Sequence, residues 1–191
     1  MSIEGLGLSQ DLVDLLTNKW GIKELYPPQQ KALPAALSGK NIMLTIPTAS
    51  GKSLVAHLTI AHRLKNDLDG QKALYIVPLK ALATEKYHEL KEIADIVGLK
   101  VGLSVGDRGG ENNSVENSDI LVCTSEKLDS LLRNRSELIS KIGIIVSDEF
   151  HLLHDPGRGP TLEVLISRIR HKRPEAQIIA LSATVGNCEI L

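Results

Sequence analysis

The sequence predicts an α/β fold in which a mostly parallel sheet carries helices on both faces. Short, almost continuously apolar runs alternate with segments whose apolar residues recur at helical spacing. This is the pattern of parallel strands that are buried under helices. A chain of 191 residues with 42% hydrophobic residues can build one core. Since we find no repeat or low-complexity linker, we expect a single domain over residues 1–191.

Composition and charge narrow the class of protein. Aromatic residues make up only 3% of the chain, so the core must be aliphatic, and the net charge of −1 gives no global signal for nucleic acid. Any nucleic-acid site must therefore be local. Cys123 and Cys188 lack the C-x-x-C spacing of a zinc site, which favours a reducing, cytoplasmic compartment. The sequence contains no recognisable signal peptide or membrane span, and we expect no membrane partner.

The first part of the chain, 1–40, is predicted to hold two short helices. Ser9 is a candidate cap for a helix that ends at Gly21. A stretch with Tyr26 and two prolines then leads into a second helix through Leu37, which Pro34 makes uncertain.

The rest of the chain alternates between strands and helices. We expect strands at 42–46, 73–77, 101–105, 120–123, 142–147 and 177–181, and helices at 52–65, 79–97, 126–134 and 160–171. The polar, Gly- and Asn-rich segment 107–117 is predicted to be a loop. Five polar motifs directly follow predicted strands. Because ligands bind at the carboxyl ends of parallel strands, these motifs are expected to share one functional edge.

A candidate phosphate-binding loop follows the first of these strands. The stretch 41–53 reads N-I-M-L-T-I-P-T-A-S-G-K-S and ends with Gly51, Lys52 and Ser53. Backbone N–H groups at the start of the next helix can bind phosphate, Lys52 adds a positive charge, and the Ser53 hydroxyl suits Mg²⁺. The full Walker A pattern has glycine where Ile46 stands. An ordinary turn and helix start therefore remains an alternative.

A pair of carboxylates follows the apolar strand 142–147. Asp148 can organise Mg²⁺ beside the phosphate loop, and Glu149 can polarise the attacking water. A solvated turn is the alternative for an isolated Asp-Glu pair. His151 and His154 form an H-x-x-H pattern, but no further histidine or cysteine cluster supports a zinc site.

Taken together, the motifs resemble those of superfamily two helicases. P-T-A-S-G-K-S (47–53), D-E-F-H (148–151) and S-A-T (182–184) are similar to motifs I, II and III of that group, which often lacks the leading glycine of motif I. L-Y-P-P-Q (25–29) resembles the adenine-reading Q motif, V-P-L-K-A-L-A (77–83) motif Ia, and T-S-E-K (124–127) motif Ib. R-G-P-T-L-E (158–163) resembles a segment of the superkiller-like DExH branch. Within it, the chain is most similar to archaeal DNA repair helicases related to the helicase domain of polymerase theta.

This resemblance implies a first RecA-like P-loop NTPase domain with ATP and Mg²⁺ as cofactors, and it implies a role for each matching residue. The residues expected to bind ATP are Tyr26, Gln29, Thr48, Ala49, Ser50, Gly51, Lys52 and Ser53. Lys52, Asp148 and Glu149 are expected to be catalytic, with Mg²⁺ held by Ser53 and Asp148. His151, Ser182 and Thr184 are expected to couple the motifs. Nucleic acid is expected at Pro78, Lys80, Gly106, Asp107, Thr124 and Arg158.

The resemblance further implies a helicase ATPase that translocates on and unwinds single-stranded or forked DNA, in repair or recombination, as a monomer at the nucleoid if the source is archaeal. The chain ends at Leu191, directly after motif III. We therefore expect a truncated part of a longer protein, without the second RecA-like lobe or accessory domains, that binds nucleotide weakly and hydrolyses almost none. Three alternatives stay open: an RNA helicase of the same branch, a catalytically silent binding lobe, and a different P-loop enzyme such as a small kinase.

A basic cluster near the end of the chain has two interpretations. Arg168, Arg170, His171, Lys172 and Arg173 could contact nucleic acid, but cations also suit the C-terminal end of a helix dipole. We favour the dipole.

Overall fold

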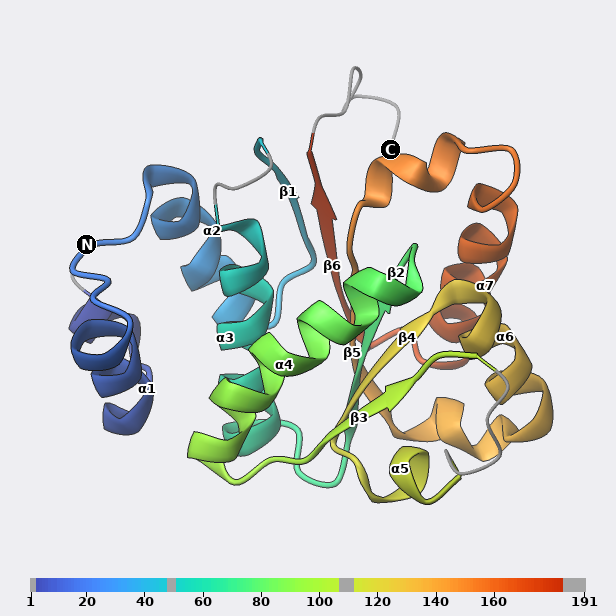
Figure 1. Cartoon of the computed structure of the whole chain (residues 1–191), viewed down its shortest axis with the longest axis horizontal. Coiled ribbons are helices and arrows are strands. Elements are labelled where there is room, and N and C mark those ends of the chain that lie inside the picture. The colour runs from blue at the N-terminus through green and yellow to red at the C-terminus, as the bar shows by residue number, and fades with distance from the viewer. Residues whose placement is uncertain (1–2, 48–50, 107–111, 184–191) are drawn as a thin grey trace.

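A single parallel sheet organises the molecule (Figure 1). The computed structural model describes residues 3–47, 51–106 and 112–183, apart from the side chains of 112–114 and 136. Its six strands lie in the order β1-β6-β5-β2-β4-β3, and every neighbouring pair is parallel. The predicted α/β architecture is confirmed. Since all strands run the same way, their carboxyl ends meet along one edge of the sheet.

The bounds of the elements agree closely with the apolar pattern. The strands are β1 (Ile42–Thr45), β2 (Lys72–Val77), β3 (Val101–Ser104), β4 (Ile120–Thr124), β5 (Ile142–Ser147) and β6 (Gln177–Ser182). The α-helices are α1 (Gln10–Asp14), α2 (Pro27–Leu37), α3 (Lys52–Asn66), α4 (Lys80–Val97), α5 (Asn112–Asn117), α6 (Ser125–Asn134) and α7 (Gly159–Lys172). The short helical turns are η1 (Ile3–Leu6), the π-helical η2 (Leu15–Lys19), η3 (Ser136–Lys141) and η4 (Phe150–His154). None of the helices described in residues 3–183 is both long enough and apolar enough to cross a membrane.

Two hydrophobic clusters cover the two faces of the sheet. In β2, Ala73, Tyr75 and Val77 join the cluster under α2, α3 and α4, whereas Leu74 and Ile76 join the cluster under α6 and α7. This alternation follows from the two-residue period of a strand. The helices lie on both sides of the sheet in Figure 1, as the apolar strands required.

The prediction of a loop at 107–117 is partly wrong. Residues 112–117 form the short helix α5, while 107–111 lie outside the described residues. Val115 explains the difference, because its side chain is buried in the cluster under α6. One apolar residue in a polar segment is thus enough to fix a turn of helix against the core.

The strand order brings β1, which leads into the candidate phosphate loop, close to the strands that precede S-A-T (β6) and D-E-F-H (β5). β6 lies between β1 and β5, and Thr45 is paired with Ser182. The N–H of Ile46 continues this pairing, since it donates to the carbonyl of Ser182 at 3.2 Å. Ile46 itself is buried in the core. This packing accounts for an apolar residue where the full Walker A pattern has glycine.

Candidate nucleotide-binding site

The helix that carries Lys52 begins at a glycine that no other residue can replace without strain. Gly51 has a φ of 67° and precedes the first residue of α3. A Cβ at this position would lie 2.5 Å from Nε2 of Gln29. The sharp entry leaves Lys52 and Ser53 on the first turn, where N–H groups without helical partners face the loop. Thr48, Ala49 and Ser50 lie outside the described residues.

Lys52 and Glu149 form an ion pair across the mouth of the site. Lys52 is 6% exposed, and its Nζ donates to Oε1 of Glu149 at 3.0 Å. Glu149 has a φ of 51°, and it is the one non-glycine residue with positive φ in the described part of the chain. The left-handed conformation costs a residue of this type about 1–2 kcal/mol. Strain is therefore stored at the residue that was predicted to act on water.

Asp148 is held by hydrogen bonds to both of its carboxylate oxygens. Oδ1 accepts the N–H of Glu149 at 2.9 Å, and Oδ2 accepts the hydroxyl of Tyr75 at 3.0 Å. Burial raises the pKa of Asp148, and these two bonds act in the opposite direction. A buried carboxylate of raised pKa favours a cation partner that compensates for its desolvation.

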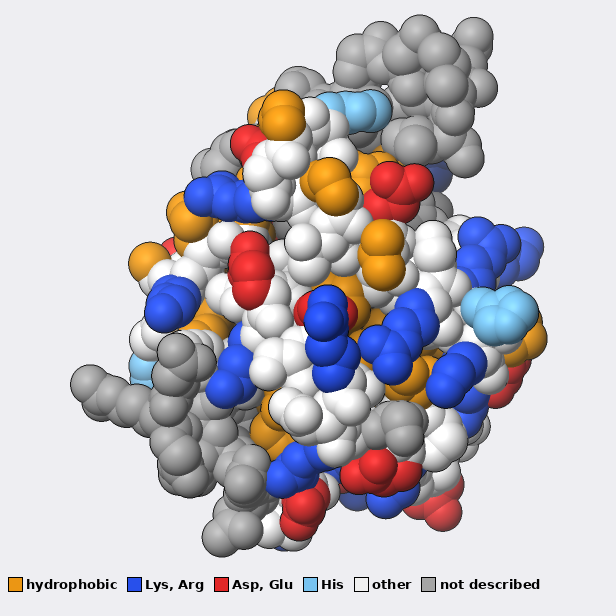
Figure 2. All heavy atoms as spheres, turned by 90° about the vertical axis from the view of Figure 1, so that its right-hand side faces the viewer, with side chains coloured by type: hydrophobic (Ala, Val, Ile, Leu, Met, Phe, Trp, Pro, Cys, Tyr) orange, Lys and Arg blue, Asp and Glu red, His pale blue; other side chains and the backbone are white. Residues whose placement is uncertain are grey.

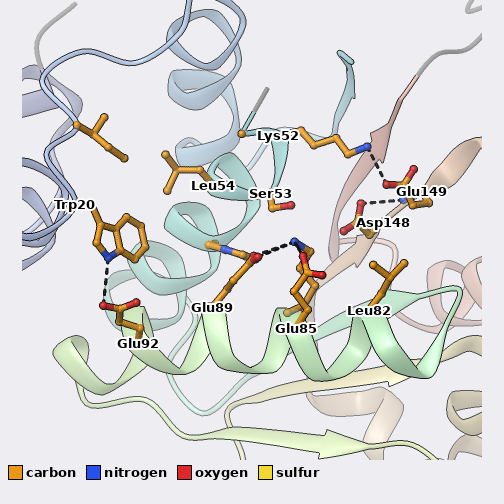
Figure 3. A pocket seen from close by; sticks show the side chains of 14 residues that line it. Trp20, Lys52, Ser53, Leu54, Leu82, Glu85, Glu89, Glu92, Asp148 and Glu149 are labelled. Atoms are coloured by element: carbon orange, nitrogen blue, oxygen red, sulfur yellow. Dashed lines mark hydrogen bonds and ion pairs between the residues drawn. The ribbon is translucent and has the colours of Figure 1, made fainter. Parts of the chain in front are cut away.

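A cavity of about 670 Å³ joins these groups (Figure 3). Lys52, Ser53 and Leu54 reach it from α3, Asp148 and Glu149 from the end of β5, and Leu82, Glu85 and Glu89 from α4. Trp20 and Ile22 line it as well, and Figure 3 places Trp20 at the opposite end from Glu149. The Ser53 hydroxyl and the Asp148 carboxylate supply oxygen donors on one wall. Oxygen donors suit Mg²⁺, which keeps several waters and binds few protein groups.

A second polar cluster lines the same cavity between α3 and α4. Lys86 pairs with Glu85 at 3.0 Å and with Glu89 at 2.9 Å, and the two partners raise its pKa despite its burial. Nε2 of the buried His57 is 3.8 Å from Oε2 of Glu89. Burial, followed by the charge of Lys86, nevertheless lowers the pKa of His57 to about 3. The imidazole is therefore neutral near neutral pH, and the contact with Glu89 is not an ion pair.

The predicted adenine-reading segment lies against the phosphate loop. Gln29 is buried; its Oε1 accepts the N–H of Tyr26 at 2.9 Å, and its Nε2 donates to the carbonyl of Gly51 at 2.8 Å. Tyr26 precedes α2 and is 62% exposed. The structure thus brings Gln29 to the loop. Contact of either side chain with adenine stays a prediction.

The residues expected to couple the motifs lie close to the same edge. Nδ1 of His151 is 3.4 Å from Oε2 of Glu149. Ser182 is buried at the end of β6, beside the strand that leads into the loop. Thr184 lies outside the described residues. The zinc alternative gains no support, because residues 3–47, 51–106 and 112–183 hold no group of three metal-ligating side chains.

The predicted nucleic-acid residues line a separate hollow of about 380 Å³. Its lining includes Pro78, Lys80, Gly106, Thr124 and Arg158. Thr124 also caps α6, since its hydroxyl accepts the N–H of Lys127 at 3.4 Å. Asp107 lies outside the described residues. The five described residues therefore form one surface, and their contact with nucleic acid remains a prediction.

Sequence reasoning missed several residues of these sites. Lys127 donates to the carbonyl of Gly106 at 2.7 Å and lines the same hollow. Tyr75 donates to Asp148 and Lys86 lines the cavity, although neither residue belongs to a strand-end motif. A lysine within T-S-E-K was a usable signal for Lys127, whereas Tyr75 reads as an ordinary strand residue.

The basic cluster at 168–173 lies at the end of α7. Arg170, His171 and Lys172 occupy its last turn, as the dipole interpretation predicts. Arg168 donates to the carbonyl of Leu132 at 3.3 Å, and Arg173 donates to Oε1 of Gln71 at 3.0 Å. Figure 2 views the side that carries α6 and α7, where Lys and Arg side chains gather across the middle of the surface.

Comparison with known proteins gives the family. The family description "DEAD/DEAH box helicase" matches residues 26–191, which include the phosphate loop, the Asp148-Glu149 pair and Ser182. The chain belongs to the DEAD/DEAH box helicases. The match begins at Tyr26, the second residue of the predicted adenine-reading segment of this helicase domain.

Relatives of this helicase domain share sequence along its whole length. The ATP-dependent DNA helicase Hel308 of Methanocella arvoryzae is 47% identical over 100% of this chain, which covers 26% of that protein. Proteins of the same name from Pyrococcus horikoshii and Thermococcus kodakarensis are 45% and 44% identical, and the chain covers 26% and 16% of them. The chain thus spans about a quarter or less of these relatives.

Proposed function

We propose that the chain is the ATP-binding lobe of an ATP-dependent DNA helicase that acts in repair or recombination. The observation that carries this proposal is the convergence of Lys52, Ser53, Asp148 and Glu149 on one cavity from two separate elements. The names of the relatives, which describe ATP-dependent DNA helicases, support the choice of ATP and DNA.

The residues divide the work of phosphoryl transfer between them. Lys52 and the N–H groups at the start of α3 bind the outer phosphates of ATP, and Ser53 and Asp148 hold Mg²⁺. Bound Mg²⁺ neutralises charge on the β- and γ-phosphates. Glu149 orients the attacking water and accepts its proton.

The ion pair between Lys52 and Glu149 suggests how these roles are timed. With the pair intact at 3.0 Å, Lys52 neutralises the carboxylate that has to act on water. A phosphate that draws Lys52 away leaves the Glu149 carboxylate without its ion-pair partner and able to bind the attacking water. Glu149 would then be active only when ATP occupies the site.

Nucleic acid would lie on the hollow formed by Pro78, Lys80, Gly106, Thr124 and Arg158. Lys80 and Arg158 supply positive charge, while the hollow also presents backbone and hydroxyl groups of the kind that bind phosphates. Such contacts fix position without reading sequence, which suits a motor that moves along a strand.

A second RecA-like lobe and accessory domains would complete the motor. An arginine supplied across the site is worth roughly 10³–10⁵ in rate in comparable enzymes. We therefore expect weak nucleotide binding and almost no hydrolysis by residues 1–191 alone. Fast turnover by this chain would contradict that expectation.

The test is an ATPase assay on a longer protein that includes the second lobe. We expect single-stranded DNA to stimulate turnover and Glu149→Gln to abolish it. Stimulation by RNA alone would indicate an RNA helicase instead. Absence of turnover under all conditions, with intact folding, would indicate a silent binding lobe. Turnover that needs neither nucleic acid nor Glu149 would refute the proposal of an ATP-driven helicase.

A further inference from the structure

A tyrosine in the centre of the sheet touches the carboxylate of the nucleotide site. Tyr75 lies in β2 and is fully buried, and its hydroxyl donates to Oδ2 of Asp148 at 3.0 Å. In the register of the sheet, Tyr75 stands opposite Val146 of β5. The N–H of Asp148 donates to the carbonyl of Ile76, so the pairing continues past the end of β5. Side chains alternate along a strand, which directs Val146 and Asp148 to the face that carries Tyr75.

This contact completes the fixation of the Asp148 carboxylate. The N–H of Glu149 donates to Oδ1 and the Tyr75 hydroxyl donates to Oδ2, so one backbone donor and one buried side-chain donor hold the two oxygens. Rotation of the carboxylate about its bond would break both hydrogen bonds. Each oxygen of a carboxylate can accept a further bond, which leaves capacity for a cation or its water.

The cavity of the nucleotide site places Ser53 and Asp148 on the same lining. The hydroxyl of Tyr75 donates to Asp148 from the core side of this lining. Asp148 is one of the two residues that our proposed function assigns to Mg²⁺.

We propose that Tyr75 is a positioning residue that orients Asp148 for the Mg²⁺ of the nucleotide site. The inference rests on the proposed function, because it needs a Mg²⁺-dependent nucleotide. A phenylalanine would fill the same space in the core, so packing alone does not require the hydroxyl. Hydrogen-bond partners of metal-binding groups typically change metal affinity by 10–100-fold when they are removed.

The test compares Tyr75→Phe with the parent chain of 191 residues. Binding of a fluorescent N-methylanthraniloyl-ADP is measured while Mg²⁺ is titrated. Mg²⁺–nucleotide association in solution is identical for all variants, so differences report the protein. Tyr87→Phe, on α4, is the matched control because it removes the same hydroxyl away from Asp148.

We expect Tyr75→Phe to raise the half-maximal Mg²⁺ concentration about tenfold and to leave binding without Mg²⁺ unchanged. Tyr87→Phe should leave both quantities unchanged. An unaltered Mg²⁺ midpoint in folded Tyr75→Phe would overturn this inference and leave the proposed function standing. If the parent chain showed no Mg²⁺-dependent binding, the proposed nucleotide site itself would fail, and this inference with it.

A second measurement does not depend on the folding of Tyr75→Phe. The chain has three tyrosines, so a protein labelled with ¹³C at tyrosine Cζ gives three signals. Tyr26→Phe and Tyr87→Phe assign the third signal to Tyr75 by elimination. We expect this signal to shift when Mg²⁺ is added to the ADP-bound protein, because the hydrogen bond to Asp148 changes. A signal that does not move would overturn the proposal.

Discussion

Replacement of His57 by glutamine should change how the stability of the protein depends on pH. His57 lies in α3, is 3% exposed and packs its ring 5.4 Å from that of Tyr75. Its Nε2 has no hydrogen-bond partner in the described part of the chain. Burial and the charge of Lys86 lower the pKa of His57 to about 3, whereas an unperturbed histidine titrates near 6.5.

The sign and size of the effect follow from proton binding. As the pH falls below 6.5, the unfolded chain binds a proton at His57 that the folded chain does not bind. The contribution of His57 to stability is therefore complete above pH 6.5 and is lost progressively as the pH falls towards 3. One proton corresponds to about 1.4 kcal/mol per pH unit. Burial of neutral His57 should therefore lower the free energy of unfolding by about 2 kcal/mol at pH 5.

The assay is urea unfolding at pH 7.5 and pH 5, followed by circular dichroism. Between these pH values the parent protein should lose about 2 kcal/mol more of its free energy of unfolding than His57→Gln. His88→Gln is the control, because His88 is an exposed histidine on α4 and should behave like the parent. An equal loss in the parent and in His57→Gln would refute a buried, neutral His57.

Three further predictions concern the site and its surroundings. Glu149→Gln should lower hydrolysis in the longer protein by about 10²-fold or more, measured by phosphate release, and should keep ATP affinity within about fivefold of the parent because the pair with Lys52 is partly exposed. Gly159→Ala should lower the free energy of unfolding by about 3 kcal/mol in urea titrations, since its Cβ would lie 1.9 Å from the carbonyl oxygen of Leu153; unchanged stability would contradict this backbone packing. Lys80→Ala should weaken binding of single-stranded DNA and reduce its log–log salt dependence by about 0.7, with ATP affinity unchanged. An unchanged salt slope would remove Lys80 from the DNA surface.

Much of the fold was predictable because buried parallel strands leave a strong mark in the sequence. The run Ile142–Ser147 is buried along its whole length, and its apolar side chains serve both faces of the sheet. Lys52 and Glu149, the partners of the ion pair, were also predictable, because Lys52 opens a helix and Glu149 follows Asp148 at the end of a strand on the shared edge. The local sequence indicated the chemical role of each residue. The strand order of the folded sheet then brings the two residues together.

Other features depend on contacts that a linear pattern does not contain. The bond from Tyr75 to Asp148 joins residues 73 positions apart and requires the register of β2 against β5. The low pKa of His57 depends on how deeply α4 covers α3, and on where Lys86 falls on that helix. Helix α5 formed in a segment predicted to be a loop because the core accepts Val115. These features are products of tertiary packing.

The most direct test of the central claim is equilibrium binding of ATP to residues 1–191, with and without Mg²⁺. Lys52→Met is the matched variant, because methionine keeps the length of a side chain that is only 6% exposed and removes its charge. We predict saturable, Mg²⁺-dependent binding by the parent chain and a loss of about tenfold or more in Lys52→Met. Equal affinity in both proteins, or no binding by a folded parent chain, would contradict a nucleotide site at this edge of the sheet.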